Sequence, residues 1–70
     1  MTDTLSGRAA TNLKAEIIRR GMTQEEFAEK AGISRITMSR ILNGHTDMDL
    51  TRLEKFAAVL GVEPSKLLND

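Results

Sequence analysis

The segment from residue 24 to residue 43 constrains the fold most strongly, because it predicts two short helices joined by a tight turn. Thr23 and Glu26 have the spacing of a capping box, in which each residue satisfies an amide donor of the other at a helix start. Gly32 is suited to end this helix, since the residue after a helix often adopts a left-handed backbone. Ser34 can then cap the second helix.

Apolar residues recur at helical spacing on both predicted helices and define their inward faces. These positions are Phe27, Ala28 and Ala31 on the first helix, and Met38 and Ile41 on the second. Ala28 is small at the place where the two helices must cross. A larger side chain there is expected to push the second helix away from the first.

The outward face of the second helix carries groups that suit the edges of DNA bases. The candidate base-reading residues are Arg35, Ile36, Ser39 and Arg40. An arginine can donate two hydrogen bonds to guanine, a hydroxyl adapts to several bases, and an aliphatic group can pack on the thymine methyl. The alternatives are a solvated charged face and, for Ile36, a rim contact with another helix. Spacing alone does not decide between them.

Further segments of the chain extend this pattern beyond the two helices. They include the helix-opening Gln24, the turn residue Gly32 and the closing Asn43 and Gly44, and they cover residues 21–28, 31–35, 39–44 and 50–62. With these segments the chain resembles the Cro/phage-repressor helix-turn-helix family over roughly residues 12 to 68. The resemblance implies an all-α, compact five-helix lambda-repressor-like DNA-binding domain with the helix-turn-helix at helices 2 and 3. Such domains usually bind duplex DNA as a symmetric pair.

The resemblance also implies contacts with phosphates. Gln24 and Asn43 match positions where family members hold phosphates on either side of the groove, and their amides suit that task. The full set of candidate phosphate-binding residues is Thr23, Gln24, Ser34, Thr37, Asn43 and His45. From the residues alone, Asn43 is a helix terminator before Gly44, and His45 is an exposed loop residue.

The charge distribution supports DNA binding only in part. Ten basic and ten acidic residues cancel, whereas a duplex-binding domain usually shows a basic patch. Between Lys30 and Thr46, however, three residues are basic and none is acidic. The predicted reading surface is therefore locally positive. Non-specific affinity is expected to be weak, because it grows with the number of phosphates neutralised.

Composition argues against several classes of function. The 70 residues allow one domain, and the absence of Cys excludes a disulfide framework or a thiolate metal site. A single His45 cannot assemble a metal centre, and no nucleophile–base pair indicates an enzyme. No apolar run approaches the roughly 20 residues that span a bilayer, and no basic-then-apolar leader precedes the first helix. We therefore expect no cofactor, no metal, no catalytic residue, no membrane partner and a cytoplasmic location.

The segments around the two central helices are expected to be scaffold. Residues 1–5 are predicted to be a disordered tail and residues 6–70 the helix-turn-helix domain. A first helix is expected over about residues 6–20, with Ile17 and Ile18 among its apolar positions. Its basic residues, expected mainly on a solvated face, are Arg8, Lys14, Arg19 and Arg20.

Two later helices are predicted after a loop that runs through Asp47. Asp49 can cap the first of them, which Gly61 ends, and Pro64 fits the first turn of the second. The apolar positions of the longer helix are Leu50, Leu53, Phe56, Ala57 and Leu60. Leu67 and Leu68 can pack on the core or face a second subunit.

The sequence thus predicts a sequence-specific transcriptional regulator of the phage or bacterial repressor or Cro-like type, which reads the major groove with residues 35–42. We expect a weak homodimer that pairs through its C-terminal helix and binds an inverted-repeat operator in duplex DNA. One alternative is an antitoxin that binds a toxin protein and autoregulates its operator. Another is an interaction module that has lost DNA binding, although Gln24, Asn43 and the two outward arginines argue against it.

Overall fold

The computed structural model describes residues 5–46 and 48–69 of the chain. Its elements are α1 (Leu5–Arg19), α2 (Gln24–Ala31), α3 (Arg35–Leu42), α4 (Leu50–Leu60) and the 3₁₀-helix η1 (Pro64–Leu67). The predicted all-α fold, with the helix-turn-helix at the second and third helices, is confirmed. The expected fifth helix is a single 3₁₀ turn. Residues 1–4 of the predicted tail and Asp47 of the loop lie outside the described residues, and α1 already includes Leu5.

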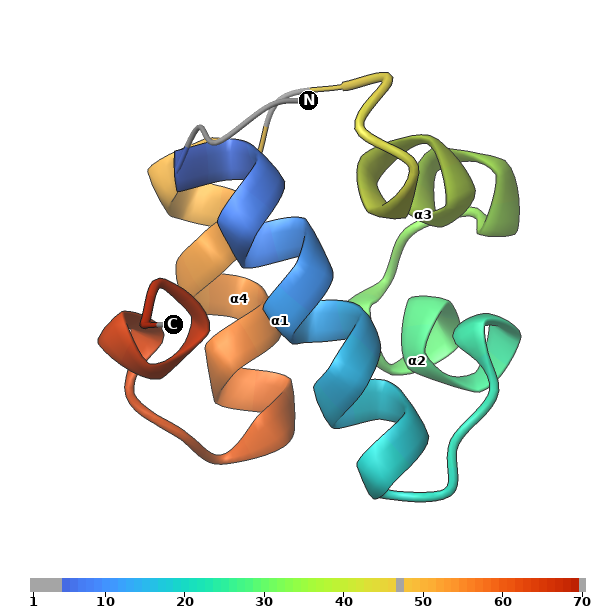
Figure 1. Ribbon diagram of the computed structural model, residues 1–70. Helices are drawn as coiled ribbons and strands as arrows, with labels where there is room; N and C mark the ends of the chain where they lie inside the picture. Colours follow the sequence, from blue (N-terminus) through green and yellow to red (C-terminus); the bar gives the residue numbers. More distant parts are fainter. Residues whose placement is uncertain (1–4, 47, 70) are drawn as a thin grey trace.

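The helix-turn-helix pair is docked on a scaffold made by the other helices. In the view of Figure 1, α2 and α3 lie on one side of α1, and α4 and η1 lie on the other. The pair α2 and α3 packs together, while α3 also contacts α1 and α2 contacts α4. The direction of α3 is therefore fixed by packing against both α1 and α2 and not by the turn alone.

Local side-chain chemistry sets the starts of α2, α3 and α4 where the sequence predicts them. The Thr23 hydroxyl accepts from the backbone N–H of Glu26, whose carboxylate accepts from the backbone N–H of Thr23. Ser34 and Asp49 cap α3 and α4 by accepting from the N–H three residues further on. Each such cap is worth about 1 kcal/mol relative to Ala, so the three helix starts are specified locally.

All four α-helices end on the same backbone motif, in which a glycine adopts positive φ. Gly32 closes α2 at φ 74°, with its N–H donating to the Glu29 carbonyl and the Ile33 N–H donating to the Ala28 carbonyl. A side chain is strained in this conformation, so glycine lets the chain pass from α2 to α3 in three residues. The other three helices end in the same way at Gly21, Gly44 and Gly61.

The core is one cluster of buried apolar side chains to which all five helices contribute. Phe27 of α2 and Phe56 of α4 are fully buried, with ring centroids 5.6 Å apart and planes inclined at 55°. The predicted inward residues Met38 and Ile41 are confirmed as core residues. The remaining members are Ala9, Leu13, Ile17, Ala28, Ala31, Leu42, Leu53, Ala57, Leu60 and Leu67.

Two residues predicted on the apolar faces are exposed instead. Ile18 is 71% exposed and Leu50 is 67% exposed. Ile18 follows the buried Ile17. Neighbouring residues on a helix point about 100° apart, so only Ile17 points into the core. Leu50 is the first residue of α4, and the buried residues of this helix begin one turn later at Leu53.

One acidic residue, Glu16, is buried at 6% exposure and is paired with two arginines at the end of α1. Its carboxylate accepts from Arg19 and, at 2.7 Å, from Nη1 of Arg20. Arg20 also donates at 3.0 Å to the carbonyl of Leu60, the last residue of α4. Arg20 is exposed, as expected, but it also ties the C-terminal end of α4 to the end of α1.

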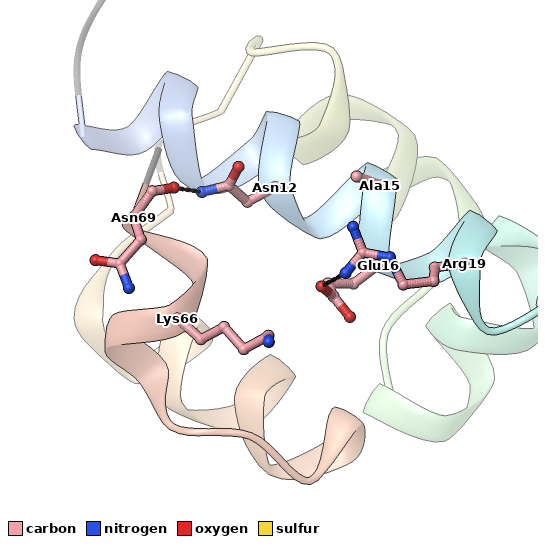
Figure 2. Close-up of a pocket in the computed structure, with 6 residues that line it drawn as sticks. All are labelled: Asn12, Ala15, Glu16, Arg19, Lys66 and Asn69. Atoms are coloured by element: carbon pink, nitrogen blue, oxygen red, sulfur yellow. Dashed lines mark hydrogen bonds and ion pairs between the residues drawn. The ribbon is translucent and has the colours of Figure 1, made fainter.

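Asn12 of α1 anchors the C-terminal end of the chain. Its side-chain amide donates at 2.7 Å to the Leu67 carbonyl and also donates to the Asn69 carbonyl, a bond drawn in Figure 2. The Leu67 side chain is fully buried, whereas Leu68 is only half-buried. Leu67 therefore belongs to the core of its own chain and is not available to a second subunit.

Ala28→Leu is expected to destabilise the fold strongly, because a buried site beside α3 has no room for three more carbon atoms. Overpacking of this kind commonly costs about 1–3 kcal/mol, and each kcal/mol lowers Tm by about 4–8 °C in a domain of this size. Thermal unfolding followed by circular dichroism measures the effect. Lys55→Ala, at an exposed site on α4, is the control and is expected to stay within about 0.5 kcal/mol of the parent protein. An unchanged Tm for Ala28→Leu would show that the helices do not cross closely there.

Arg20→Ala is expected to lower the free energy of unfolding more than Arg19→Ala. The Arg20 side chain is 33% exposed and loses the bond to Leu60 as well as the ion pair, whereas the Arg19 side chain is 65% exposed. We expect a loss of about 1–2 kcal/mol for Arg20→Ala and below about 1 kcal/mol for Arg19→Ala. Urea unfolding measures both. Equal losses would mean that the bond from Arg20 to α4 contributes nothing.

Candidate nucleic-acid interface

An open groove on the outward face of α3 is lined by all four residues that the sequence assigned to base reading. Its lining consists of Gln24, Arg35, Ile36, Ser39 and Arg40. Four of these side chains come from α3 and the fifth from the first residue of α2. The sequence grouped Gln24 with the phosphate contacts, but the structure brings it to the same groove as the base-reading candidates. We call this feature the α3 groove.

Arg35 and Arg40 present two exposed guanidinium groups to the α3 groove. Neither forms an ion pair with any residue in 5–46 or 48–69, in contrast to Arg19 and Arg20, which bind Glu16. A guanidinium offers five N–H donors in a planar fork and carries no acceptor. Both groups are therefore available to a ligand that presents paired acceptors.

Ile36 lies between the two arginines on the same face and is 70% exposed. The alternative of a rim contact with another helix of the chain is not supported by this exposure. Single exposed aliphatic residues are common on protein surfaces. At this position, however, the side chain is placed to meet an apolar group, such as the thymine methyl, on any ligand that fills the groove.

Ser34 and Thr37 form a hydrogen-bonded pair at the start of α3. The Ser34 hydroxyl accepts from the backbone N–H of Thr37 at 3.0 Å and donates to the Thr37 hydroxyl oxygen at 2.9 Å. A hydroxyl group has one hydrogen to donate, and Ser34 uses it within the cap. Thr37 is therefore the member of the pair whose hydrogen remains for a phosphate.

Asn43 is bonded to Ser39 through both its backbone and its side chain. The Asn43 backbone N–H donates to the Ser39 carbonyl at 3.0 Å, and its Nδ2 donates to the Ser39 hydroxyl oxygen at 3.2 Å. Asn43 therefore ends α3, as its place before Gly44 suggested, and also contacts a residue of the α3 groove.

The other candidate phosphate-binding residues lie around the groove and not in it. Thr23 uses its hydroxyl oxygen and its backbone N–H in the capping box of α2. His45 is exposed after α3, and its backbone N–H donates to the Arg40 carbonyl at 2.8 Å. Ser34, Thr37 and Asn43 complete this flanking set. Of the six candidate phosphate-binding residues, Gln24 alone lines the α3 groove.

Acidic side chains of α2 border the α3 groove on one side. A neighbouring depression is lined by Arg35 together with Glu25, Glu26, Ala28, Glu29 and Ile33. Arg35 therefore lies between an acidic surface and the groove.

A third depression, shown in Figure 2, lies between α1 and η1 and includes none of the predicted site residues. It is lined by Asn12, Ala15, Glu16, Arg19, Lys66 and Asn69. Within residues 5–46 and 48–69, no three His, Cys, Asp or Glu side chains gather in a way that could bind a metal ion. Over the same residues, no helix has the length and apolar character needed to cross a bilayer.

The side-chain hydrogen bonds around the α3 groove were not predicted from the sequence. Ser34 and Thr37 are three residues apart and Ser39 and Asn43 are four apart, spacings at which side chains meet on a helix. This signal was present in the sequence. It predicts proximity but not which group donates, and that direction comes from the structure.

Comparison with known sequences gives matches over most of the chain. Residues 13–67 match a helix-turn-helix family. A hypothetical transcription factor from Neisseria meningitidis serogroup B is 34% identical over 59 residues, covering 84% of this chain and 56% of that protein. Control protein C.MunI from a Mycoplasma species is 39% identical over 49 residues, covering 70% and 66%. This chain therefore spans less than two thirds of the length of either relative.

Solved structures give the same result. The hypothetical transcription factor NHTF from Neisseria superposes with a TM-score of 0.87 at 32% identity, covering 94% of this chain and 76% of that one. The restriction-modification controller protein C.AhdI from Aeromonas hydrophila shares the fold, with a TM-score of 0.81 at 24% identity and coverage of 89% and 94%. The chain thus belongs to the Cro/C1-type helix-turn-helix family, as its sequence pattern predicts.

Proposed function

We propose that this chain is a sequence-specific transcriptional regulator that binds double-stranded DNA and reads the major groove with α3. The observation that carries the proposal is the α3 groove, where two exposed guanidiniums without ion-pair partners among the described residues flank an exposed aliphatic side chain. The names of the relatives, a transcription factor and a control protein, support the same conclusion.

The side chains of the α3 groove have separate roles in this proposal. Arg35 and Arg40 each donate to the O6 and N7 atoms of a guanine, and Ile36 packs on a thymine methyl. Ser39 bonds to a base edge beside Arg40. An α-helix fits the major groove, which is about 12 Å wide, so these side chains can reach bases while the body of the domain stays outside.

Gln24 and the flanking residues position the domain on the two strands. Thr37 donates its hydroxyl hydrogen to a phosphate, and the amides of Gln24 and Asn43 donate on either side of the groove. Thr23, Ser34 and His45 complete the phosphate-facing set. These contacts fix orientation and register but carry no sequence information themselves.

A role as a phage or bacterial repressor or Cro-like protein follows from the same proposal. Because the ligand is duplex DNA, we place the protein in the cytoplasm and assign it no enzymatic activity and no cofactor. The antitoxin alternative is not favoured, since the relatives named above are described as a transcription factor and control proteins.

Two copies of the chain are proposed to bind one operator. A single α3 contacts only a few base pairs, too little information to select a site among millions of competitors. Pairing about a two-fold axis places the two α3 helices about 34 Å apart on one face of the duplex. Leu67 is buried in its own core, so the apolar side chains at the C-terminal helix that a second copy can contact are the half-buried Val62, Pro64 and Leu68. The interface is therefore small, and we expect the free protein to be mostly monomeric.

Arg35→Ala and Arg40→Ala are each expected to weaken binding to the preferred operator by about 1–3 kcal/mol and to relax the choice at one base pair, because each loses a bidentate contact. Selection from a random duplex library defines the operator, and titration of its point variants measures the change. Thr37→Val is expected to weaken all sequences alike, since it removes a phosphate donor. Lys66→Ala on η1 removes a cation outside the groove and serves as the control. Unaltered sequence preference in both arginine variants would mean that the reading face is wrongly assigned.

The selected operator is expected to be an inverted repeat with half-sites about one helical turn apart, occupied by two chains. Sedimentation of the protein alone and on the operator measures both states. The free protein should be largely monomeric at low concentration, because only a small apolar surface is left near η1. One chain per site, with no dyad in the selected sequence, would refute the dimer.

A further inference from the structure

The hydrogen bond between Asn43 and Ser39 gives the Ser39 hydroxyl a direction. Nδ2 of Asn43 donates to Oγ of Ser39 at 3.2 Å. No other side-chain hydrogen bond of Ser39 is found within the described part of the chain, so its hydroxyl hydrogen is not engaged there. Ser39 lines the α3 groove. Its oxygen is thus an acceptor toward the protein, and its hydrogen is left for a ligand in the groove.

The position of Asn43 is itself set by the end of α3. Its backbone N–H donates to the Ser39 carbonyl, and Gly44 follows at φ 77°, so the residue is fixed one helical turn after Ser39. A side-chain amide nitrogen carries two hydrogens. One is used on Ser39 and the second remains for a phosphate. Asn43 can therefore orient a base-reading residue and contact the DNA backbone at the same time.

We propose that Asn43 is a positioning residue that holds the Ser39 hydroxyl as a hydrogen-bond donor, so that α3 reads an acceptor on a base at this place. The acceptors in the major groove are N7 and O6 of guanine, N7 of adenine and O4 of thymine, whereas cytosine presents only an amino donor. The inference rests on the proposed function, because it assumes that the α3 groove meets bases.

The neighbouring polar side chains on α3 also present hydrogen-bond donors to the groove. Arg35 and Arg40 can only donate. The bond from Ser34 to Thr37 leaves the Thr37 hydrogen as the outward group of that pair. The face of α3 thus offers donors together with the aliphatic Ile36. Guanine and thymine present acceptors, and in thymine a methyl group, so they are the bases that this surface favours.

Asn43→Asp is expected to turn the Ser39 hydroxyl from a donor into an acceptor toward the groove. This variant therefore distinguishes a positioning role of Asn43 from a purely structural role at the end of α3. A carboxylate only accepts, so the Ser39 hydrogen turns toward Asp and only oxygen lone pairs face the groove. The preference at this base pair is then expected to move from an acceptor to an amino group. A residue that only ended the helix would change stability without changing which base atom is read.

The experiment uses the full chain and the operator selected from the random duplex library. The base pair read by Ser39 is identified as the one at which Ser39→Ala relaxes the preference. Duplexes are then prepared with base analogues at that pair. One set lacks a single acceptor, as in 7-deazaguanine, and the other lacks an amino group, as in purine for adenine or 2-pyrimidinone for cytosine. Binding is measured by fluorescence anisotropy. The affinity that Ser39→Ala loses on each analogue duplex is subtracted from the loss measured for the other proteins. Ser39→Ala lacks the hydroxyl, so its loss reports only the altered base pairing of the analogue.

The parent protein is expected to lose about 3- to 10-fold in affinity when one acceptor is removed, as for a single neutral hydrogen bond, and nothing when an amino group is removed. Asn43→Ala is expected to reduce the sensitivity to the acceptor, and combining it with Ser39→Ala should cause no further change in preference. Asn43→Asp should transfer the sensitivity to the amino group. Ser65→Ala and Asn69→Ala are matched controls at exposed sites outside the groove, and thermal melts of all variants report folding.

Two results overturn the inference while leaving the proposed function intact. One is sensitivity of the parent protein to loss of the amino group. The other is an unchanged base preference in Ser39→Ala or Asn43→Ala, although Arg35→Ala and Arg40→Ala each lose preference at the base pair that the arginine reads. Failure to select any operator overturns the proposed function and the inference together. If Asn43→Asp does not fold, the analogue series with the parent protein and Asn43→Ala decides.

Discussion

The packing of Phe27 against Phe56 holds the helix-turn-helix pair on the rest of the chain. Both rings are fully buried, and the chain has no Trp or Tyr that could replace them. Burial of one such side chain is worth about 1.5–3 kcal/mol, and a tilted aromatic pair adds about 0.5–1.5 kcal/mol. These are large amounts beside the roughly 5–15 kcal/mol of a whole domain. An isolated helix of eight residues is not stable in water, so α3 depends on this core both to exist and to point outward.

The parts of the fold that depend on neighbouring residues could be predicted from the sequence, and those that depend on distant residues could not. The capping box at Thr23 and the helix end at Gly32 follow from backbone chemistry within a few positions, and both were predicted correctly. The exposure of Ile18 depends on where the other helices lie, which a helical period does not specify. The bond from Arg20 to the carbonyl of Leu60 joins residues 40 positions apart, and no local pattern indicates it.

The residues of the candidate site could be predicted from the sequence, but the hydrogen bonds between them could not. Helical geometry allows Arg35 and Arg40 both to point outward, and the structure gathers them with the other base-reading candidates in one groove. That Gln24 also lines this groove follows from the angle between α2 and α3, which is set by core packing. The direction of the Ser39–Asn43 bond needs atomic positions.

The neutral net charge changes how such a surface can achieve selectivity. Affinity for any duplex rises with the number of phosphates neutralised, and here ten acidic residues balance ten basic ones, with acidic residues of α2 lining the depression beside Arg35. The attraction common to all sequences is therefore small, and a larger share of the binding energy must come from contacts with bases. A buried donor that finds no acceptor costs about 1–3 kcal/mol. If the α3 groove reads bases as proposed, its arginines and oriented hydroxyls are consequently expected to select an operator mainly by penalising wrong bases, each of which leaves one of these donors without a partner.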